Sequence, residues 1–389
     1  MVTFSSYPDD ERPRRVIDAF RDEGMFVDLI CLGNSNYDKA ETADNLKITR
    51  IPMKHRRGGK FTYAFQYGSF ILVATLLFAL RAIHRRYHLV YVHNMPDILV
   101  ISALMPKALG AKVILDLHDP MPELMTTIFK LEKDSFNVRL IRGMEKWSIA
   151  RANQVITVNQ ACKDLFSGRS CQAEKITVVM NTPDTKIFPF RKAVRHAGVE
   201  FAGRKPFIFM YHGTVVERNG LDVAIAALEL AHTKMPDAQL RIFGPSTPFL
   251  EHVMAMVRAK GLQESVQYLG PKRLEDLVPA IEAADIGVIP NPRNSFTDIN
   301  TPTRIFDYLS LGKTAIVPNT QGIKDYFPSD SLMYFEAGDA ADLARKMEYA
   351  YSHRDELGPA ACRGQEIYLA HTWQQERQTL LTSVNQIFN

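Results

Sequence analysis

The sequence predicts an α/β protein with two doubly wound domains, each built on a parallel β-sheet. Short runs rich in Val and Ile alternate with longer amphipathic segments in both halves of the chain, which is the pattern of buried parallel strands in βαβ units. A length of 389 residues fits two domains of ordinary size. Hydrophobic residues make up 46% of the chain and charged residues 23%, which excludes a disordered or polytopic protein.

The first half begins with a strand in residues 1–7, which we expect to be short because it lies at the start of the chain. Five further strands are predicted in FVDLICL, LVYVHN, KVILDLH, QVITVN and ITVVMN. The second half has five, in FIFMYHG, QLRIFG, VQYLG, IGVIPN and TAIVPN. Periodicity lapses between them in residues 189–206, where Gly, Pro and charged residues accumulate. This predicts domains over residues 1–195 and 205–365, followed by an amphipathic helix in residues 366–389.

The cysteines and the amino-terminal segment indicate a cytoplasmic protein. The four cysteines form no C-x-x-C pair and no cluster with histidine at metal-ligand spacing. The first thirty residues contain charged side chains from Asp9 to Arg15 where a secretory signal needs an apolar segment.

Positive charge is concentrated in the first half. Residues 1–200 contain 29 basic and 21 acidic residues, whereas residues 201–389 contain 18 and 22. The span from Asn45 to Pro96 has no acidic residue and nine basic ones, which are Lys47, Arg50, Lys54, Arg56, Arg57, Lys60, Arg81, Arg85 and Arg86. Within it, the apolar core from Phe70 to Leu80 is shorter than the roughly 20 residues that a membrane crossing needs, so we expect a helix that does not span.

Two interpretations of residues 45–96 stay open. The first is a buried core helix with arginines at its C-terminal end, where the helix dipole favours them. The second adds peripheral binding to an anionic membrane, at the inner face of the plasma membrane, because basic residues flank an apolar, aromatic segment. Nucleic acid is not expected as the partner, since no helix-turn-helix, zinc-finger or RNP pattern occurs.

Ligands of doubly wound sheets bind beyond the carboxyl ends of the strands, so the residues that follow each strand are candidates. Neither G-x-G-x-x-G nor a Walker motif occurs, which disfavours classical dinucleotide and P-loop enzymes. In FMYHGTVVERNG the backbone N–H groups at Gly213 and Thr214 are candidates for cradling a phosphate, with Arg218 beside them. A strand, a glycine turn and a helix are also common without any ligand.

The stretch from residue 286 to 319 is the second candidate. A strand ends at Asn291, a loop rich in Asn, Thr and Pro follows, and a helix is predicted to begin near Thr303. Arg304 offers a planar positive fork suited to a diphosphate, and Asp307 is placed to accept the two hydroxyls of a ribose. A cation at a helix N-terminus opposes the helix dipole, which argues for a ligand.

On these motifs the chain resembles the retaining GT-B glycosyltransferases of family 4. PTRIFDYLSLGKTAIV is similar to the segment with the second acid of the E-x7-E signature, and YHGTVVERNGLD resembles the donor loop. VVMNTPDTKIF, LDLHDPMPEL and YPDDERPRR resemble three further family segments. The resemblance implies two Rossmann-like domains facing a central cleft, the first binding the acceptor and the second the nucleotide-sugar, with the C-terminal helix crossing back to the first domain.

The resemblance also implies the site. Asp307 matches the ribose-binding acid, but Ile299 stands where the first signature acid belongs, and Thr214 and Asn219 replace the usual Arg and Lys. The nucleotide and diphosphate are assigned to Gly213, Thr214, Arg218, Asn219, Gly244, Pro271, Thr303, Arg304 and Asp307. The donor sugar is assigned to Asp298, Asn300 and Thr301. His118, with Asp119 beside it, is expected to line the acceptor site as a catalytic residue, as is Arg304 at the leaving diphosphate, although a lone histidine after a strand is often structural.

We therefore predict a retaining hexosyltransferase that moves a hexose or N-acetylhexosamine from a nucleotide-sugar, UDP favoured and GDP possible, to a glycan or polyprenyl-diphosphate-linked acceptor in cell-surface polysaccharide synthesis. Because no D-x-D triplet occurs, we expect neither a metal nor any other cofactor. The alternatives are another GT-B enzyme, such as a nucleotide-sugar epimerase or a phosphorylase, and a non-catalytic sugar-binding or scaffold protein.

Overall fold

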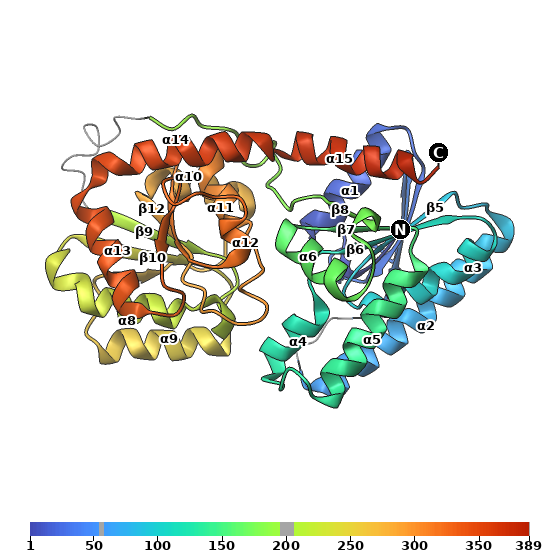
Figure 1. Cartoon of the computed structure of the whole chain (residues 1–389), viewed down its shortest axis with the longest axis horizontal. Helices are drawn as coiled ribbons and strands as arrows, with labels where there is room; N and C mark the ends of the chain where they lie inside the picture. The colour runs from blue at the N-terminus through green and yellow to red at the C-terminus, as the bar shows by residue number, and fades with distance from the viewer. Residues whose placement is uncertain (54–57, 195–205, 389) are drawn as a thin grey trace. The chain divides into compact units, whose positions relative to one another are not determined.

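The computed structural model describes residues 1–53, 58–194 and 206–388, and the chain forms two compact units (Figure 1). Unit 1 comprises Met1–Asn181 and the chain from Glu376 onward, and unit 2 comprises Thr182–Gln375. The expected domain limits at 195 and 205, and the basic residues Lys54, Arg56 and Arg57, lie outside the described residues.

The boundaries expected from the sequence need correction at two places. Residues 182–194, assigned by sequence to the first domain, belong to unit 2, as do residues 366–375. The cause is a set of hydrogen bonds made by Gln365, whose side chain accepts the N–H of Ala193 and donates to the carbonyl oxygens of Arg191 and Leu309. These bonds fasten the connecting segment to unit 2.

Unit 1 contains an eight-stranded sheet in the order β3-β4-β2-β1-β5-β6-β7-β8. Every neighbouring pair is parallel except β3 and β4. The strands are β1 (Val2–Ser6), β2 (Val27–Leu32), β3 (Ala40–Ala43), β4 (Leu46–Ile51), β5 (Leu89–His93), β6 (Lys112–Leu117), β7 (Gln154–Thr157) and β8 (Ile176–Val178). The first strand is short, as expected, yet it lies in the middle of the sheet.

Helices cover both faces of this sheet (Figure 1). They are α1 (Glu11–Asp22), α2 (Lys60–His84), η1 (Asp97–Ala103), α3 (Leu104–Ala108), α4 (Met121–Phe129), α5 (Phe136–Arg151), α6 (Gln160–Arg169), η2 (Ala173–Lys175) and the terminal α15 (Trp373–Gln386). Side-chain caps fix where two of them begin, because Asp10 accepts the N–H of Arg12 and Asn159 accepts the N–H of Cys162.

Unit 2 contains a six-stranded, fully parallel sheet in the order β11-β10-β9-β12-β13-β14. The strands are β9 (Phe207–His212), β10 (Ala238–Phe243), β11 (Val266–Tyr268), β12 (Ile286–Val288), β13 (Ala315–Pro318) and β14 (Met333–Phe335). All six residues of β9 are buried. A strand at the centre of a sheet covered on both faces is mostly apolar, which explains the sequence FIFMY, and the buried His212 at its end has hydrogen-bond partners in Tyr308 and Asp307.

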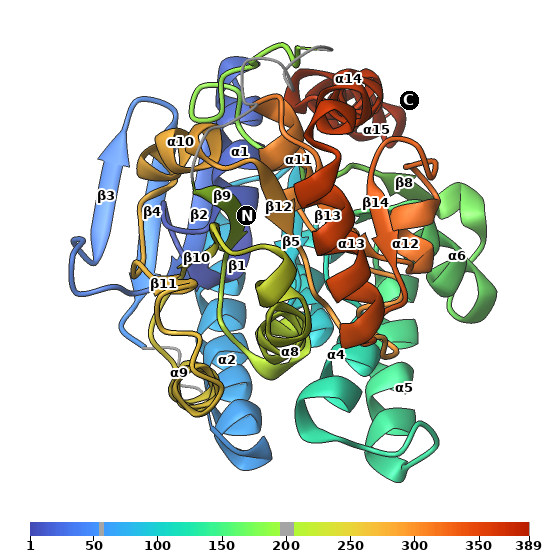
Figure 2. The same ribbon diagram turned by 90° about the vertical axis from the view of Figure 1, so that its left-hand side faces the viewer.

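The helices of unit 2 lie on both faces of its sheet, with α8 packed against α13 and α11 against α14 (Figure 2). They are η3 (Glu217–Asn219), α8 (Leu221–Ala231), η4 (His232–Lys234), α9 (Pro248–Ala259), α10 (Leu274–Ala283), α11 (Arg304–Ser310), α12 (Gln321–Lys324), α13 (Ala340–Ser352) and α14 (Arg354–Ala370).

The strands predicted from the sequence are confirmed in both units, and the sequence analysis misses β3, β4 and β14. The sequence of β4, LKITRI, alternates apolar and polar residues next to an edge strand whose four residues are all exposed. Short strands at or next to the edge of a sheet lack the continuous apolar run that identifies a central strand.

The helix α2 has 25 residues and extends well beyond the apolar core from Phe70 to Leu80 on which the length argument rests. One helix of the described chain, Phe61–His84, is long and apolar enough to cross a membrane, and 28% of its most apolar window is buried. The length argument made from the sequence is therefore wrong. What argues against a span is that Tyr67, Phe70 and Phe78 pack in the core of unit 1.

The helix expected over residues 366–389 is divided in the structure, and the chain from Glu376 onward belongs to unit 1. The helix α14 ends at Ala370 and α15 begins at Trp373. In α15 the side chains of Leu380 and Val384 are buried, and Glu376 accepts the N–H of Met180 at 2.7 Å. This hydrogen bond and the apolar face hold α15 on unit 1.

Candidate functional site

Two groups of polar side chains lie at the carboxyl edges of the sheets, one in each unit. In unit 2 the group follows strands β9, β10 and β12 and includes the start of α11; we call it the donor-side edge. Its members are His212, Gly213, Thr214, Gly244, Asn291, Arg304 and Asp307. In unit 1 the group follows β5 and β6; we call it the acceptor-side edge, and its members are His93, Asn94, Asp116, His118 and Asp119.

Arg304 is the first residue of α11, where the sequence predicts it. Its Nη1 donates to the carbonyl oxygen of His212 at 3.0 Å, and its Nη2 donates to Oδ1 of Asn291 at 3.2 Å. The guanidinium carbon lies 4.9 Å from the centre of the Tyr211 ring. A guanidinium has five N–H donors, so these bonds fix its orientation and leave donors for a ligand.

Gly213 shapes the space beside Arg304. Its φ is +122°, and a Cβ added there lies 3.4 Å from Cδ of Arg304, so the missing side chain gives the arginine room. The sequence analysis offers the Gly213 N–H to a phosphate, but that N–H donates to the carbonyl oxygen of Phe243 at 2.9 Å. The Gly213 N–H is therefore taken up by the pairing of β9 with β10, which continues one residue past the strand end.

The turn after Gly213 is held by its own side chains. The carbonyl oxygen of Thr214 accepts from Tyr211 Oη at 3.0 Å and from Asn219 Nδ2 at 2.7 Å. Asn219 therefore braces the loop, and Arg218 lies half-buried in η3 next to it. The helix that follows begins only at Leu221, so its N-terminus is not at Gly213 as the sequence suggested.

Two further assigned residues follow neighbouring strands. Gly244 allows a close approach, because an added Cβ lies 2.1 Å from the carbonyl oxygen of Gly213. Its N–H donates to the carbonyl oxygen of Gly270 at 3.0 Å. Pro271 follows Gly270 in the chain and is exposed. The N–H groups of Gly213 and Gly244 are thus both used in hydrogen bonds, to Phe243 and Gly270 respectively.

His212 links Asp307 to the buried Tyr308. Tyr308 gives its hydroxyl proton to the carbonyl oxygen of Met210 at 2.7 Å, so its oxygen accepts the Nδ1–H of His212 at 3.0 Å. Nε2 of His212 lies 3.0 Å from Oδ2 of Asp307. The imidazole of His212 thus bridges the hydroxyl of Tyr308 and the carboxylate of Asp307. The sequence analysis does not single out His212 and misses this pair.

The residues assigned to the donor sugar lie in the loop before α11. Asp298 forms an ion pair with Arg293, and Thr301 donates to the carbonyl oxygen of Gly322 at 2.6 Å. The N–H of Gly322 in turn donates to the carbonyl oxygen of Asp298 at 2.9 Å. Asn300 lies between them and is half-buried. The structure thus brings these residues together as a braced loop.

In unit 1, Asp116 is the centre of a buried ion pair. Its carboxylate accepts from Nη2 of Arg12 at 2.8 Å, from Nε of Arg12 at 2.9 Å and from Oη of Tyr91 at 3.0 Å. Burial alone raises the pKa of Asp116, but the Arg12 charge and His93 outweigh it and hold that pKa well below its ordinary range. Burial lowers the pKa of His93, so that ring is neutral at pH 7.

His118 stands at the exposed border of this cluster. Its side chain is 22% exposed, and Nδ1 lies 4.0 Å from Oδ1 of Asp116. Asn94 sets the loop, because its Oδ1 accepts the N–H groups of His118 at 3.2 Å and Asp119 at 3.4 Å. Asn94 Nδ2 donates to Oδ1 of Asp97 at 2.9 Å. His118 is therefore held in place through its backbone, with its ring reaching the surface.

His93, Asp116 and His118 bring three potential metal-ligand atoms within 4.8 Å of one another. Their chemistry does not suit a cation, because the Arg12 guanidinium already binds both oxygens of Asp116. A second positive charge at this carboxylate would meet that arginine. The cluster is an ion-pair network that supports the His118 loop.

The comparisons with known proteins agree with this organisation. The sequence profile described as "Glycosyl transferase 4-like domain" matches residues 11–182, and that described as "Glycosyl transferases group 1" matches residues 206–353. The chain belongs to the group 1 glycosyltransferases. Its two units share the GT-B fold, and both edges described above lie within the matched residues.

Curated relatives of this glycosyltransferase are distant. "Probable glycosyltransferase WbjE" of Pseudomonas aeruginosa is 20% identical over 231 residues, which cover 58% of this chain and 55% of the relative. A D-inositol 3-phosphate glycosyltransferase of Corynebacterium aurimucosum is 26% identical over 155 residues, or 36% of each chain. The chain thus matches about half the length, or less, of these relatives.

Solved structures share the fold over nearly the whole length of this glycosyltransferase. Sucrose-phosphate synthase from Thermosynechococcus elongatus has a TM-score of 0.75 at 16% identity and covers 97% of this chain and 92% of its own. The Anabaena protein HepE, solved in complex with UDP-glucose, has a TM-score of 0.73 at 13% identity and covers 99% and 98%. A glycosyltransferase from Rickettsia africae has a TM-score of 0.71 at 16% identity and covers 100% and 97%.

Proposed function

We propose that this glycosyltransferase moves a hexose or N-acetylhexosamine from a nucleotide-sugar to a glycan or lipid-linked glycan in cell-surface polysaccharide synthesis. The observation that carries the proposal is Arg304, which is held at the carboxyl edge of unit 2 by His212 and Asn291 with N–H donors left over. We favour UDP as the nucleotide, because the GT-B neighbour HepE is solved with UDP-glucose. Support for the sugar and the pathway comes from the family resemblance alone.

The proposed chemistry places the developing charge on the leaving diphosphate next to Arg304. A preorganised cation stabilises such charge without reorganising during the reaction, and a single donor of this kind is worth about 3 kcal/mol of barrier by analogy with oxyanion holes. Asp307 would accept ribose hydroxyls through the oxygen that His212 does not contact. Since the chain has no D-x-D triplet, we propose that this enzyme needs no divalent metal.

The proposed stereochemistry is retention by front-face attack. The acceptor hydroxyl attacks the anomeric carbon on the side from which the diphosphate departs and passes its proton to the departing diphosphate oxygen. We assign acceptor orientation to His118, whose ring is half-buried beside Asp116, with Asp119 next to it. A lipid-linked acceptor would place the enzyme on the inner face of the plasma membrane.

A nucleotide screen followed by a transfer assay tests the proposal. Thermal unfolding is recorded with UDP, GDP, ADP and dTDP, each with and without EDTA, because a bound ligand raises Tm by mass action. We expect a shift with UDP that EDTA does not change. Transfer from UDP-glucose and UDP-N-acetylglucosamine is then followed by NMR, with an α-linked product expected from these α-configured donors.

Four outcomes would contradict parts of the proposal. A shift that EDTA abolishes contradicts metal independence, and a β-linked product contradicts retention. Nucleotide binding without transfer to a broad panel of acceptors would instead favour a non-catalytic sugar-binding role. Sugar release that depends on inorganic phosphate would favour a phosphorylase.

A further inference from the structure

The outer face of α2 is apolar along its whole length. Phe61 is 92% exposed, Phe65 75% and Leu80 63%. The exposed large apolar side chains of α2 are Phe61, Phe65, Leu72, Val73, Leu76, Leu80 and Ile83. Most of them recur at spacings of three, four or seven residues and so form one stripe along the helix. Soluble monomers rarely expose so long an apolar stripe, which marks an interaction surface.

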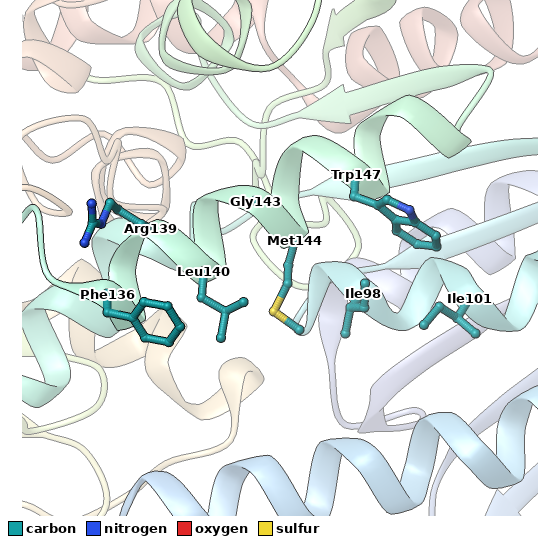
Figure 3. Close-up of a pocket in the computed structure, with 8 residues that line it drawn as sticks. All are labelled: Ile98, Ile101, Phe136, Arg139, Leu140, Gly143, Met144 and Trp147. Atoms are coloured by element: carbon teal, nitrogen blue, oxygen red, sulfur yellow. The ribbon is translucent and has the colours of Figure 1, made fainter.

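A second apolar feature lies between α5 and η1. A groove of about 840 Å³ is lined by Ile98 and Ile101 of η1 and by Phe136, Leu140 and Met144 of α5. Figure 3 shows these side chains projecting into one space from the two helices, with Trp147 of α5 at its end. Phe136 is 71% exposed and Leu140 52%. Because η1 packs against both α2 and α5, the groove lies in the neighbourhood of α2, and we call the groove and the stripe together the α2–α5 face.

The exposed charges that α2 and α5 themselves carry are positive, while the exposed acids Glu132 and Asp134 precede α5 in the chain. On α5, Arg139, Lys146 and Arg151 are exposed. The one acid of α5, Glu145, is fully buried and forms an ion pair with Arg169 at 2.5 Å, while α2 carries no acidic residue. A surface with apolar side chains, exposed cations and no exposed acid on either helix complements an anionic lipid surface.

The other side of α2 ties the helix to unit 1. Phe70 and Tyr67 make edge-to-face contacts with Phe4, at centroid distances of 5.1 and 4.8 Å. Arg81 forms an ion pair with Asp28 at 2.6 Å. A crossing helix would have to abandon this core, so α2 is suited to lie along a membrane surface rather than to pass through it.

We propose that the α2–α5 face inserts into the hydrocarbon boundary of an anionic bilayer, with one lipid hydrocarbon chain in the groove beside Trp147. The cations of α5 then meet the headgroups. This inference rests on the proposed function only in so far as that function includes a lipid-linked acceptor. A second copy of the chain is the competing occupant, but two copies related by a twofold axis bring the same face together, and their like-charged α5 helices repel.

Flotation with lipid vesicles tests the surface. The full-length protein is mixed with vesicles of phosphatidylcholine alone, or of equal parts phosphatidylcholine and phosphatidylglycerol. We expect binding to the anionic vesicles that weakens as salt is raised. The double variant Phe65→Ser/Leu76→Ser should lower the partition coefficient at least about tenfold, since each side chain inserts apolar surface. The matched control Leu230→Ser/Leu369→Ser changes exposed apolar residues of unit 2 and should bind like the wild type.

Charge reversal and fluorescence locate the contact. Arg139→Glu/Lys146→Glu should reduce binding to anionic vesicles, and Lys272→Glu, an exposed position of unit 2, should not. In a Trp373→Phe background Trp147 is the remaining tryptophan, and acyl chains brominated near the headgroup should quench it. Vesicle binding that is insensitive to both α2 and α5 variants, or a Trp147 signal that the bromine leaves unchanged, overturns the proposal.

The outcomes are separable from those of the proposed function. If the α2 variants abolish self-association in sedimentation experiments while the wild type ignores vesicles, the face binds a second copy and the membrane proposal is wrong. Each variant should keep the UDP-induced Tm shift of the wild type, which shows that it folds. Vesicle binding without any UDP shift would leave the membrane surface intact and contradict the donor-site proposal instead.

Discussion

The carboxyl edges of the two sheets use arginine in opposite ways. In unit 1, Arg12 is 6% exposed and binds both oxygens of the fully buried Asp116. In unit 2, Arg304 is only half-buried, and its two hydrogen bonds go to neutral oxygens of His212 and Asn291. A guanidinium paired with a carboxylate has its charge neutralised, whereas one held by neutral acceptors keeps it. The same residue type thus builds a scaffold at one edge and offers a net positive charge at the other.

The largest expected effect is the loss of folding stability caused by Arg12→Met. Removing one partner of a buried ion pair leaves an uncompensated charge, so the free energy of unfolding should fall by about 3–5 kcal/mol. Urea unfolding measures this. The matched variant Arg21→Met lies on the same helix, and its ion contacts to the described residues Asp18 and Asp44 are long, so it should change the free energy of unfolding by less than about 1 kcal/mol. Equal losses in both variants would show that the Asp116 pair is no scaffold.

Arg304→Ala should act on catalysis and leave folding nearly intact. Because the charge interaction grows as the diphosphate leaves, kcat and kcat/KM should fall together by roughly 10²–10³. Steady-state kinetics with UDP-sugar measures this, and Arg345→Ala, whose side chain is 65% exposed on α13, serves as the control. Unchanged turnover in Arg304→Ala would remove the leaving-group assignment.

The free energy of unfolding is expected to depend on pH through Asp97, a buried residue of unit 1. Burial, followed by the nearby Glu145 charge, raises the pKa of Asp97 to about 7. The folded state then binds more protons than the unfolded state between about pH 4 and pH 7, so this group costs stability as pH rises through that window. Asp97→Asn keeps an acceptor for Asn94 and should raise the free energy of unfolding at pH 8 by about 1–3 kcal/mol relative to wild type, with little difference at pH 4.

The control for Asp97 is Asp134→Asn, which alters a side chain that is 93% exposed. We expect its unfolding free energy to follow the wild type from pH 4 to pH 8. If the unfolding free energies of the wild type and Asp97→Asn differed by the same amount at pH 4 and pH 8, the assigned titration would be contradicted.

The smallest effect is expected from Asp307→Ala, which should raise the KM for the donor about tenfold, a loss of about 1.4 kcal/mol, while kcat changes little. The variant also removes the partner of His212 Nε2, so Asp307→Asn is measured beside it. An amide restores a hydrogen-bond partner for His212 without the charge. If both variants lost kcat rather than donor affinity, the ribose assignment would be wrong.

The sequence predicts the central strands and the family because long apolar runs and strand-end motifs such as PTRIFDYLS are local signals. Arg304 at the start of α11 is found in this way. The Arg12–Asp116 pair joins residues that are 104 positions apart, and nothing local to either one predicts the other. The same holds for His212 with Asp307, and for the N–H of Gly213, which β10 takes up. The exposed face of α2 cannot be predicted from the sequence, because composition does not show which apolar side chains point inward.

The most direct test is calorimetric titration of UDP into the wild type, Arg304→Ala and Arg345→Ala, each in EDTA. The account predicts that UDP binds the wild type and the Arg345→Ala control with the same affinity and binds Arg304→Ala at least about tenfold more weakly, a loss of about 1.4 kcal/mol. Equal UDP affinity in wild type and Arg304→Ala would contradict the claim that Arg304 offers its charge to the diphosphate.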